Sequence, residues 1–196
     1  MASYQAVGAA CEAVIRLLQQ AWRPELFNGA ELQFRVYRTT DFSSSMDFGI
    51  SLFLYRVVVN GTQRTLPSPP GPGGQPRRTQ LPLDLHFLLT PWAKEASLEQ
   101  EILGWMMRTL EDSPVLAAGL LNTVIPDAFS AGETVEIVAG QMSNEELFRI
   151  WDVLPSSFQV SVPYVARVVR IDAALDRRAG GPVLRRELDF GVLRRS

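Results

Sequence analysis

The chain has 196 residues, of which 46% are hydrophobic and 20% charged, with a net charge of −2; this is ordinary globular composition. One cysteine and one histidine exclude an intrachain disulfide and a Cys/His zinc cluster, whereas an all-carboxylate metal site stays open despite the lack of EF-hand spacing. No run of about 18 apolar residues predicts a membrane span, and the first residues lack the basic start of a signal peptide. We therefore expect a protein of a reducing cytoplasm.

Charge is distributed unevenly along the chain. Residues 1–159 carry eleven Lys and Arg against seventeen Asp and Glu, a net of −6, whereas residues 160–196 carry eight against four, a net of +4. A basic end indicates an acidic partner. A protein partner is favoured over nucleic acid, because acidic residues alternate with the basic pairs and no aromatic ladder accompanies them. A purely solvated arm is the alternative.

The N-terminal part of the chain predicts a helix followed by a strand. Apolar residues recur at spacings of three and four over residues 3–22, which predicts an amphipathic helix. Its apolar positions are Val7, Cys11, Val14, Leu18 and Trp22. Pro24 and Gly29 follow as stop signals. The stretch ELQFRVYR, residues 31–38, then alternates apolar and polar side chains, which predicts a half-buried strand.

Two further strands are predicted around a loop rich in proline and glycine. Residues 49–61 are apolar on both faces, so we expect a central strand covered on both sides. The segment 61–78 holds five prolines and four glycines, which prevent a helix or a ladder. We interpret it as an exposed loop between neighbouring strands. The next strand covers residues 79–90, and Pro91 ends it.

The middle of the chain predicts a helix, a further helical turn and a short strand. The spacing of apolar residues over 95–112 predicts an amphipathic helix. Its broad apolar face carries Leu98, Ile102, Trp105, Met106 and Leu110. The stretch VLAAGLLN, residues 115–122, predicts a further helical turn. The short strand covers ETVEIVA, 133–139.

A capped helix and a last strand complete the predicted elements. The helix over 143–155 begins with a capping box, because Ser143 and Glu146 have the spacing that lets each bond to the backbone of the other. The strand over 158–172 contains Pro163, which lacks an N–H and so predicts an edge strand or a bulge. One face of this strand is expected to carry Val160, Val162, Tyr164, Ala166 and Val168.

The order of these elements predicts the fold class. Three strands follow one another and strict β–α–β alternation is absent, which favours an α+β fold with a mixed or antiparallel sheet flanked by helices. We expect a single domain over residues 1–172. Residues 173–196 lose the pattern and predict an extended basic C-terminal arm.

Candidates for chemistry are few. His86 is the one candidate base, and it falls in the middle of a strand on the face shared with Asp84 and opposite Leu85. A Ser–His–Asp site also needs a serine at a sharp turn, but no G-x-S-x-G occurs. Cys11 lies on an apolar helix face, as structural thiols do, and GPGG at 71–74 lacks the Lys and Ser/Thr of a phosphate loop. These patterns predict no enzyme, no metal and no cofactor.

Three stretches taken together resemble a known family. They are LPLDLHFLLTPWA, ILGWMMRTLEDSPVLAAGLL and MSNEELFRIWDVLPSSFQVSVPYVARVVRID. In this order they are similar to the cap, or tail-terminator, proteins of phage-tail-like contractile injection systems, and the resemblance covers most of residues 5–172. Two positions depart from the family pattern: Ser113 stands where a histidine is common, and Pro163 enters the last strand. Some members also carry an additional C-terminal domain, for which this chain is too short.

The resemblance implies a structural role. Such proteins form hexameric rings that end the inner tube and the contractile sheath, and they hold the sheath in its extended state. The implied partners are other copies of the chain, the sheath protein and the inner-tube protein, with no nucleic acid and no membrane. The implied location is the bacterial cytoplasm during assembly and the particle afterwards.

A ring requires contacts that join one copy to the next, and we expect exposed arms and sheet edges to supply them. The candidate interface residues are Pro163, Arg177, Arg178, Arg185, Arg186, Leu188, Phe190, Arg194 and Arg195. Segment 182–195 carries six large apolar residues, which a purely solvated tail would not need. Two alternatives stay open: a monomeric adaptor that binds through the 61–78 loop or the basic tail, and an enzyme that uses His86.

Overall fold

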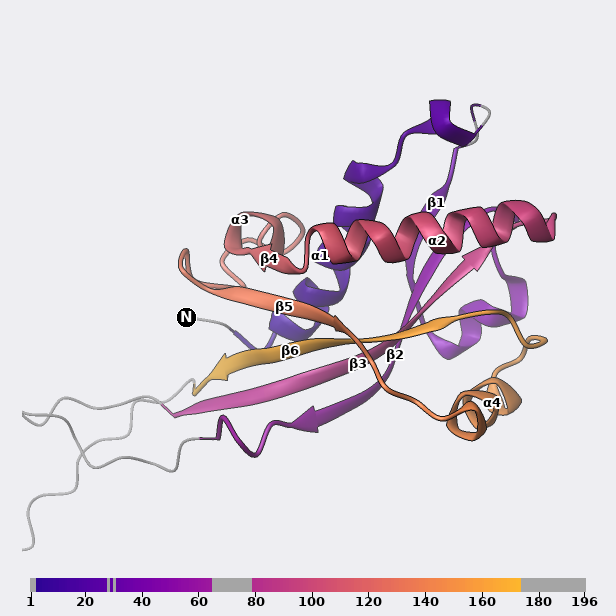
Figure 1. Ribbon diagram of the computed structural model, residues 1–196. Coiled ribbons are helices and arrows are strands. Elements are labelled where there is room, and N and C mark those ends of the chain that lie inside the picture. Colours follow the sequence, from indigo (N-terminus) through magenta and orange to yellow (C-terminus); the bar gives the residue numbers. More distant parts are fainter. Residues whose placement is uncertain (1–2, 28, 30, 65–78, 174–196) are drawn as a thin grey trace, which may run out of the picture.

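A curved mixed sheet organises the chain (Figure 1). The computed structural model describes residues 3–27, 29, 31–64 and 79–173. Within them six strands follow the order β1-β2-β3-β6-β5-β4. Their bounds are β1 Gln33–Tyr37, β2 Gly49–Val59, β3 Gln80–Trp92, β4 Val115–Ala117, β5 Thr134–Ala139 and β6 Val162–Asp172. β1 runs parallel to β2 and every other pair is antiparallel, which confirms the predicted α+β class.

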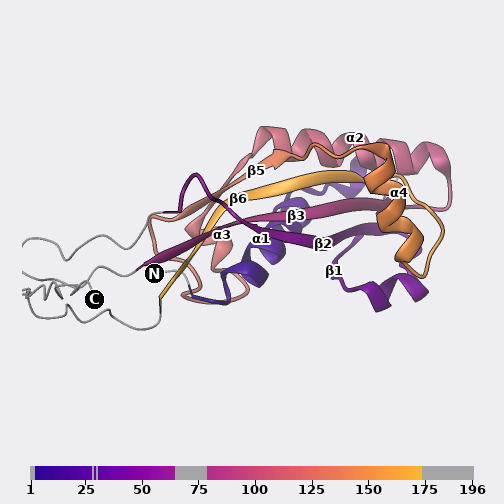
Figure 2. The same ribbon diagram turned by 90° about the horizontal axis from the view of Figure 1, so that it is seen from below.

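Helices lie on both faces of this sheet (Figure 2). One face carries α1, Ala6–Ala21, α2, Ala96–Asp112, and the short α3, Ala118–Leu121. The opposite face carries α4, Asn144–Val153, across one end of the long strands. Two 3₁₀ turns, Pro24–Phe27 and Thr39–Ser44, complete the regular structure of the described residues. None of the described helices combines the length and the apolar character that a membrane span needs.

The main core lies between α1, α2 and the sheet. The α1 positions predicted to face inward are buried at Cys11, Val14 and Leu18. They meet alternate residues of β3, including Leu85 and Phe87, both 0% exposed. This alternation confirms the core-facing orientation expected for Leu83, Leu85 and Phe87. Leu81, which was expected on the same buried side, is 41% exposed at the end of the strand.

A second, aromatic core lies on the opposite face, under α4. It consists of Tyr37, Phe42, Met46, Trp92, Trp151 and Leu154. The indole N–H of Trp151 donates to Ser161 Oγ at 2.9 Å, and that of Trp92 donates to Ser51 Oγ at 2.8 Å. Both polar ends are therefore satisfied inside an apolar cluster, as buried indoles require. Tyr37, the last residue of β1, is 6% exposed in this core.

Two strand predictions need correction. β3 continues through Pro91 to Trp92, because pairing with β2 goes on to Gly49 after pairing with β6 has ended at Leu89. The residues after α2 begin with a strand, β4, and only then form a helical turn, since β5 offers Val115–Ala117 an edge to pair with.

The last strand lies inside the sheet, so the edge placement predicted from Pro163 is wrong. β6 pairs with β3 on one side and with β5 on the other. Pro163 sits where the β5 ladder ends: its carbonyl accepts the Gly140 N–H at 2.8 Å, and pairing starts at the next residue, Tyr164. A bulge does occur in β6, but farther along, and it buries Val169 in place of the predicted Val168.

Candidate assembly surface

The cleft around His86 lies between the sheet and the start of α4. It has a volume of about 240 Å³, and its lining residues are Tyr55, Arg56, His86, Gln141, Met142, Glu146, Arg149 and Ile150. Burial, followed by the neighbouring Arg56, lowers the pKa of His86, while Asp84 acts in the opposite direction. The His86 and Tyr55 rings lie 6.2 Å apart, edge to face. His86 is therefore half-buried on the face that the strand pattern predicted.

The described residues bring no catalytic set to this cleft. The hydroxyl group in the lining of the cleft is that of Tyr55, whose pKa is raised, mainly by burial. No group of three or more His, Cys, Asp or Glu side chains suited to a metal ion occurs among the described residues. Cys11 lies in the main core, where burial and then Glu12 raise its pKa to about 12.

An apolar surface feature is the aromatic patch at α4, which we define as Phe148 of α4 and Phe158 of the segment between α4 and β6. Their rings meet edge to face at 5.3 Å, and the two side chains are 51% and 46% exposed. A groove of about 370 Å³ lies beside them, between α4 and the chain that leads to β6. Exposed aromatic rings beside a groove are typical of a surface that another protein covers.

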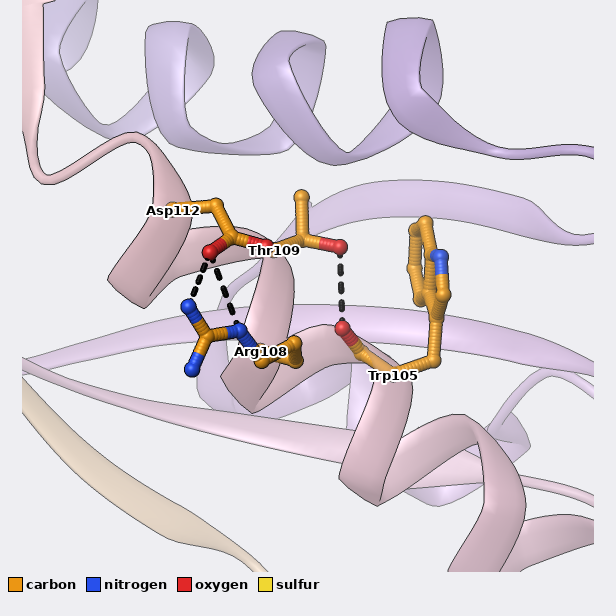
Figure 3. Close-up of polar contacts among 4 residues, drawn as sticks. All are labelled: Trp105, Arg108, Thr109 and Asp112. Carbon is orange, nitrogen blue, oxygen red and sulfur yellow. Dashed lines mark hydrogen bonds and ion pairs between the residues drawn. The ribbon is translucent and has the colours of Figure 1, made fainter.

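The outer face of α2 is charged rather than apolar. Arg108 Nε donates to Asp112 Oδ1 at 2.9 Å one turn along the helix (Figure 3). Thr109 Oγ1 donates to the carbonyl of Trp105 at 2.9 Å, and the Trp105 ring points to the other side, where it meets Trp22 at 4.9 Å. One side of α2 is thus fixed on α1, while the other is a solvated ion-pair surface.

A bulge held by Asp84 shapes the end of the sheet opposite α4. Asp84 of β3 faces two residues of β6, because Leu83 pairs with Val169 and Leu85 with Ala166. Val168 there has a φ of +58°, a strained value for a β-branched residue. Asp84 Oδ1 accepts the Val168 N–H at 2.9 Å, and Oδ2 accepts Asn60 Nδ2 at 2.9 Å. One carboxylate therefore joins β6 to the end of β2.

The 61–78 loop and the C-terminal arm leave the sheet at this same end. β2 ends at Val59, and Asn60 donates its N–H to Pro82 O at 2.9 Å. Ala173, the last described residue, donates to Thr79 O at 2.9 Å. The C-terminal arm therefore begins beside Thr79, the residue that follows the 61–78 loop.

Most of the predicted interface residues lie outside the described part of the chain. They are Arg177, Arg178, Arg185, Arg186, Leu188, Phe190, Arg194 and Arg195, and residues 65–78 of the loop lie outside it too. Pro163 is described and half-buried in the sheet. The sequence contains a signal for the aromatic patch: Phe148 is an aromatic residue outside the apolar helix face that Leu147, Ile150 and Trp151 form.

Comparisons with known proteins give a consistent match. The family model described as the Pvc16 N-terminal domain matches residues 9–185. A structure of the sheath/tube terminator of an extracellular contractile injection system, PVC, in its extended state, is similar over 96% of this chain, with 14% identity and a TM-score of 0.63. The cap of the anti-feeding prophage, a tube-terminating cap, is similar over 92%, with 15% identity and a TM-score of 0.58.

This chain spans 63% and 59% of the lengths of those two proteins. A search of curated proteins gave no match.

Proposed function

Since this chain belongs to the Pvc16 N-terminal domain family, we propose that it caps the tube and the sheath of a contractile injection system. This membership confirms the resemblance found in the sequence. The proposed cap role comes from the two similar structures. One is a sheath/tube terminator and the other is a tube-terminating cap.

The observation that carries the proposal is the extent of the structural likeness. The similarity reaches 96% of this chain, so it includes the sheet, the helices on both faces and their order. The described surfaces support a scaffold: an aromatic patch, a charged helix face and a cleft without a nucleophile or metal cluster among the described residues. A protein that works by contact needs surfaces of this kind and no reactive group.

In this proposal six copies form a closed ring. Ring closure needs head-to-tail contacts, in which each copy gives one surface and receives another. The basic arm, residues 173–196, is one such surface, because it leaves the sheet at the end opposite α4 and is rich in apolar residues. The interface residues predicted on this arm keep that role in the proposal.

The aromatic patch at α4 is then the surface that meets the tube or sheath. β6 begins beneath α4 and ends at the start of the arm, so its eleven residues separate the two surfaces by about 30 Å. One end of the sheet is therefore available for neighbours in the ring, and the other for the last layer of the tube and sheath. The chain acts without catalysis, in the bacterial cytoplasm during assembly and in the particle afterwards.

Electron microscopy of particles from cells that lack this chain tests the proposal. We expect tubes and sheaths of irregular length with open or contracted ends, and restoration by the wild-type gene. Particles of normal length with intact extended sheaths would reject capping. They would favour the adaptor role instead.

A further inference from the structure

Among the described residues, no strand pairs with the outer edge of the second half of β2. β1 pairs with β2 only from Gly49 to Phe53, and beyond this point Figure 1 shows no described strand on the side of β2 that faces away from β3. Val57 and Val59 are 46% and 43% exposed there. Natural sheets protect such edges with proline, charged side chains, bulges or a covering segment. This half of β2 starts with a register shift between Leu54 and Arg56 and has one charged side chain, that of Arg56, whereas residues 57–59 are all valine.

The backbone of this edge is available for pairing. Asn60 donates its N–H to Pro82 of β3, and backbone groups of successive residues in a strand point to opposite sides. Val57 and Val59 therefore direct their N–H and C=O groups away from β3. Their side chains lie on the helix-covered face, because they pair with the buried Leu85 and Leu83.

The C-terminal arm contains a segment whose pattern matches this edge. Over residues 187–192, ELDFGV, the apolar Leu188, Phe190 and Val192 alternate with Glu187 and Asp189. This period of two is that of a strand with one apolar face. Placed beside β2 with its apolar side chains next to Val57 and Val59, it would direct its two carboxylates to the opposite face.

Charge favours this arrangement. Arg56 pairs with His86, so its exposed side chain lies on the face to which Glu187 and Asp189 would point. The exposed valines would be covered at the same time by Leu188 and Phe190. One orientation of the segment thus satisfies the apolar face, the charged face and the free backbone groups together.

We propose that residues 187–192 of one copy add as a strand to the free edge of β2 in the next copy. This inference rests on the proposed ring and names the contact that closes it. The arm starts beside Thr79, and the thirteen residues from 174 to 186 can extend about 40 Å, which is enough to leave its own sheet. Edge and arm are different surfaces of one chain, as a head-to-tail contact requires.

Disulfide trapping in assembled particles tests this contact. Two differently tagged copies are made together with the other particle proteins. One carries Val59→Cys, and the other carries one substitution on the arm. The test substitutions are Leu188→Cys, Phe190→Cys and Val192→Cys, and the matched controls are Glu187→Cys and Asp189→Cys. The native Cys11 is buried and its pKa is raised to about 12, so we expect it to form few disulfides. Particles with wild-type chains measure how many disulfides Cys11 forms by itself.

The expected result is a disulfide between the two tagged copies that forms several-fold more readily from 188, 190 or 192 than from 187 or 189. Equal yields at both sets would overturn the strand, since alternation is its signature. A chain that carries both cysteines is a further check. If it forms the disulfide only within itself and none forms between copies, the contact between neighbours is wrong.

The same preparation separates this inference from the proposed function. If the isolated particles carry the chain at their ends but no bond forms between copies, the strand contact is wrong and the cap role stands. If the particles lack the chain altogether, the cap role is wrong, and the ring contact falls with it.

Discussion

At the scale of single residues, Asp84 stabilises the local geometry from which both the arm and the loop leave the sheet. Asp84→Ala removes the acceptor of the Val168 N–H and the partner of Asn60. We expect a loss of about 1–3 kcal/mol in the free energy of unfolding, measured by urea denaturation. Glu136→Gln is the control, because Glu136 forms only an exposed ion pair with Arg167; a similar loss in both variants would show that Asp84 has no special role.

His86 makes stability depend on pH, and the sign follows from its lowered pKa. In the unfolded chain His86 binds a proton with a pKa near 6.5, whereas its pKa in the folded chain is lower. As the pH drops below about 7, the unfolded chain therefore takes up more protons than the folded chain, and the free energy of unfolding falls. Burial and the neighbouring Arg56 disfavour the charged ring, and Asp84 partly offsets them. His86→Gln should flatten this part of the curve in unfolding experiments from pH 8 to pH 5; parallel curves would contradict the account.

Period-two reasoning predicted correctly which face His86 and Asp84 share, because β3 is regular and the position of each side chain follows from local geometry. It failed in β6, where Val169 rather than Val168 is buried. That shift comes from a bulge, which depends on pairing with Asp84 eighty-four residues earlier. No local pattern contains such a contact.

At the scale of elements, α4 begins with the capping box that the sequence predicted. Ser143 Oγ accepts the Glu146 N–H at 3.2 Å, and Glu146 Oε2 accepts the Ser143 N–H at 2.9 Å. Ser143→Ala should cost about 1 kcal/mol in unfolding free energy. Ser97→Ala, at an exposed position in the first turn of α2, should stay within about 0.5 kcal/mol. Equal effects would mean that the cap contributes nothing of its own.

The aromatic patch at α4 should matter for attachment more than for folding. Phe148→Ser removes a ring that is 51% exposed, so we expect a folded protein that is retained on fewer particle ends. Retention is measured by blotting purified particles for the chain. Tyr4→Ser, which also removes an exposed ring but near the start of α1, should leave retention unchanged. Full retention of Phe148→Ser would exclude the patch from the interface.

Helices and strands with a strong periodicity were predictable, and α1, α2, α4 and β5 confirm this. β4 was missed because three residues carry little pattern, and their strand conformation depends on the neighbouring β5. The second half of β2 also differs from its prediction. Its residues are apolar enough for a covered strand, yet the short β1 leaves that half uncovered.

At the scale of the whole molecule, the arm is expected to decide assembly rather than folding. Deletion of residues 182–196 removes only residues outside the described fold. We expect an unchanged thermal unfolding midpoint and a loss of ring mass and of sheath capping, measured by native mass spectrometry and electron microscopy of particles. Unchanged ring formation and capping would remove the arm from the mechanism.

The arrangement of the strands was beyond the reach of sequence patterns. Alternation shows which strands exist, but the order β1-β2-β3-β6-β5-β4 depends on pairing between strands that are far apart in the sequence. Pro163 illustrates the difficulty: a missing N–H predicted an outer edge, whereas the ladder simply ends beside it within the sheet. The shared exit of the loop and the arm depends on this order too.

The most direct test of the central claim is a cryo-EM reconstruction of the particle end that lies opposite the baseplate. The account predicts six copies of this fold in a closed ring over the last layer of tube and sheath, with α4 facing that layer. A particle end without density for this chain, or with the chain present as an isolated copy, would contradict it.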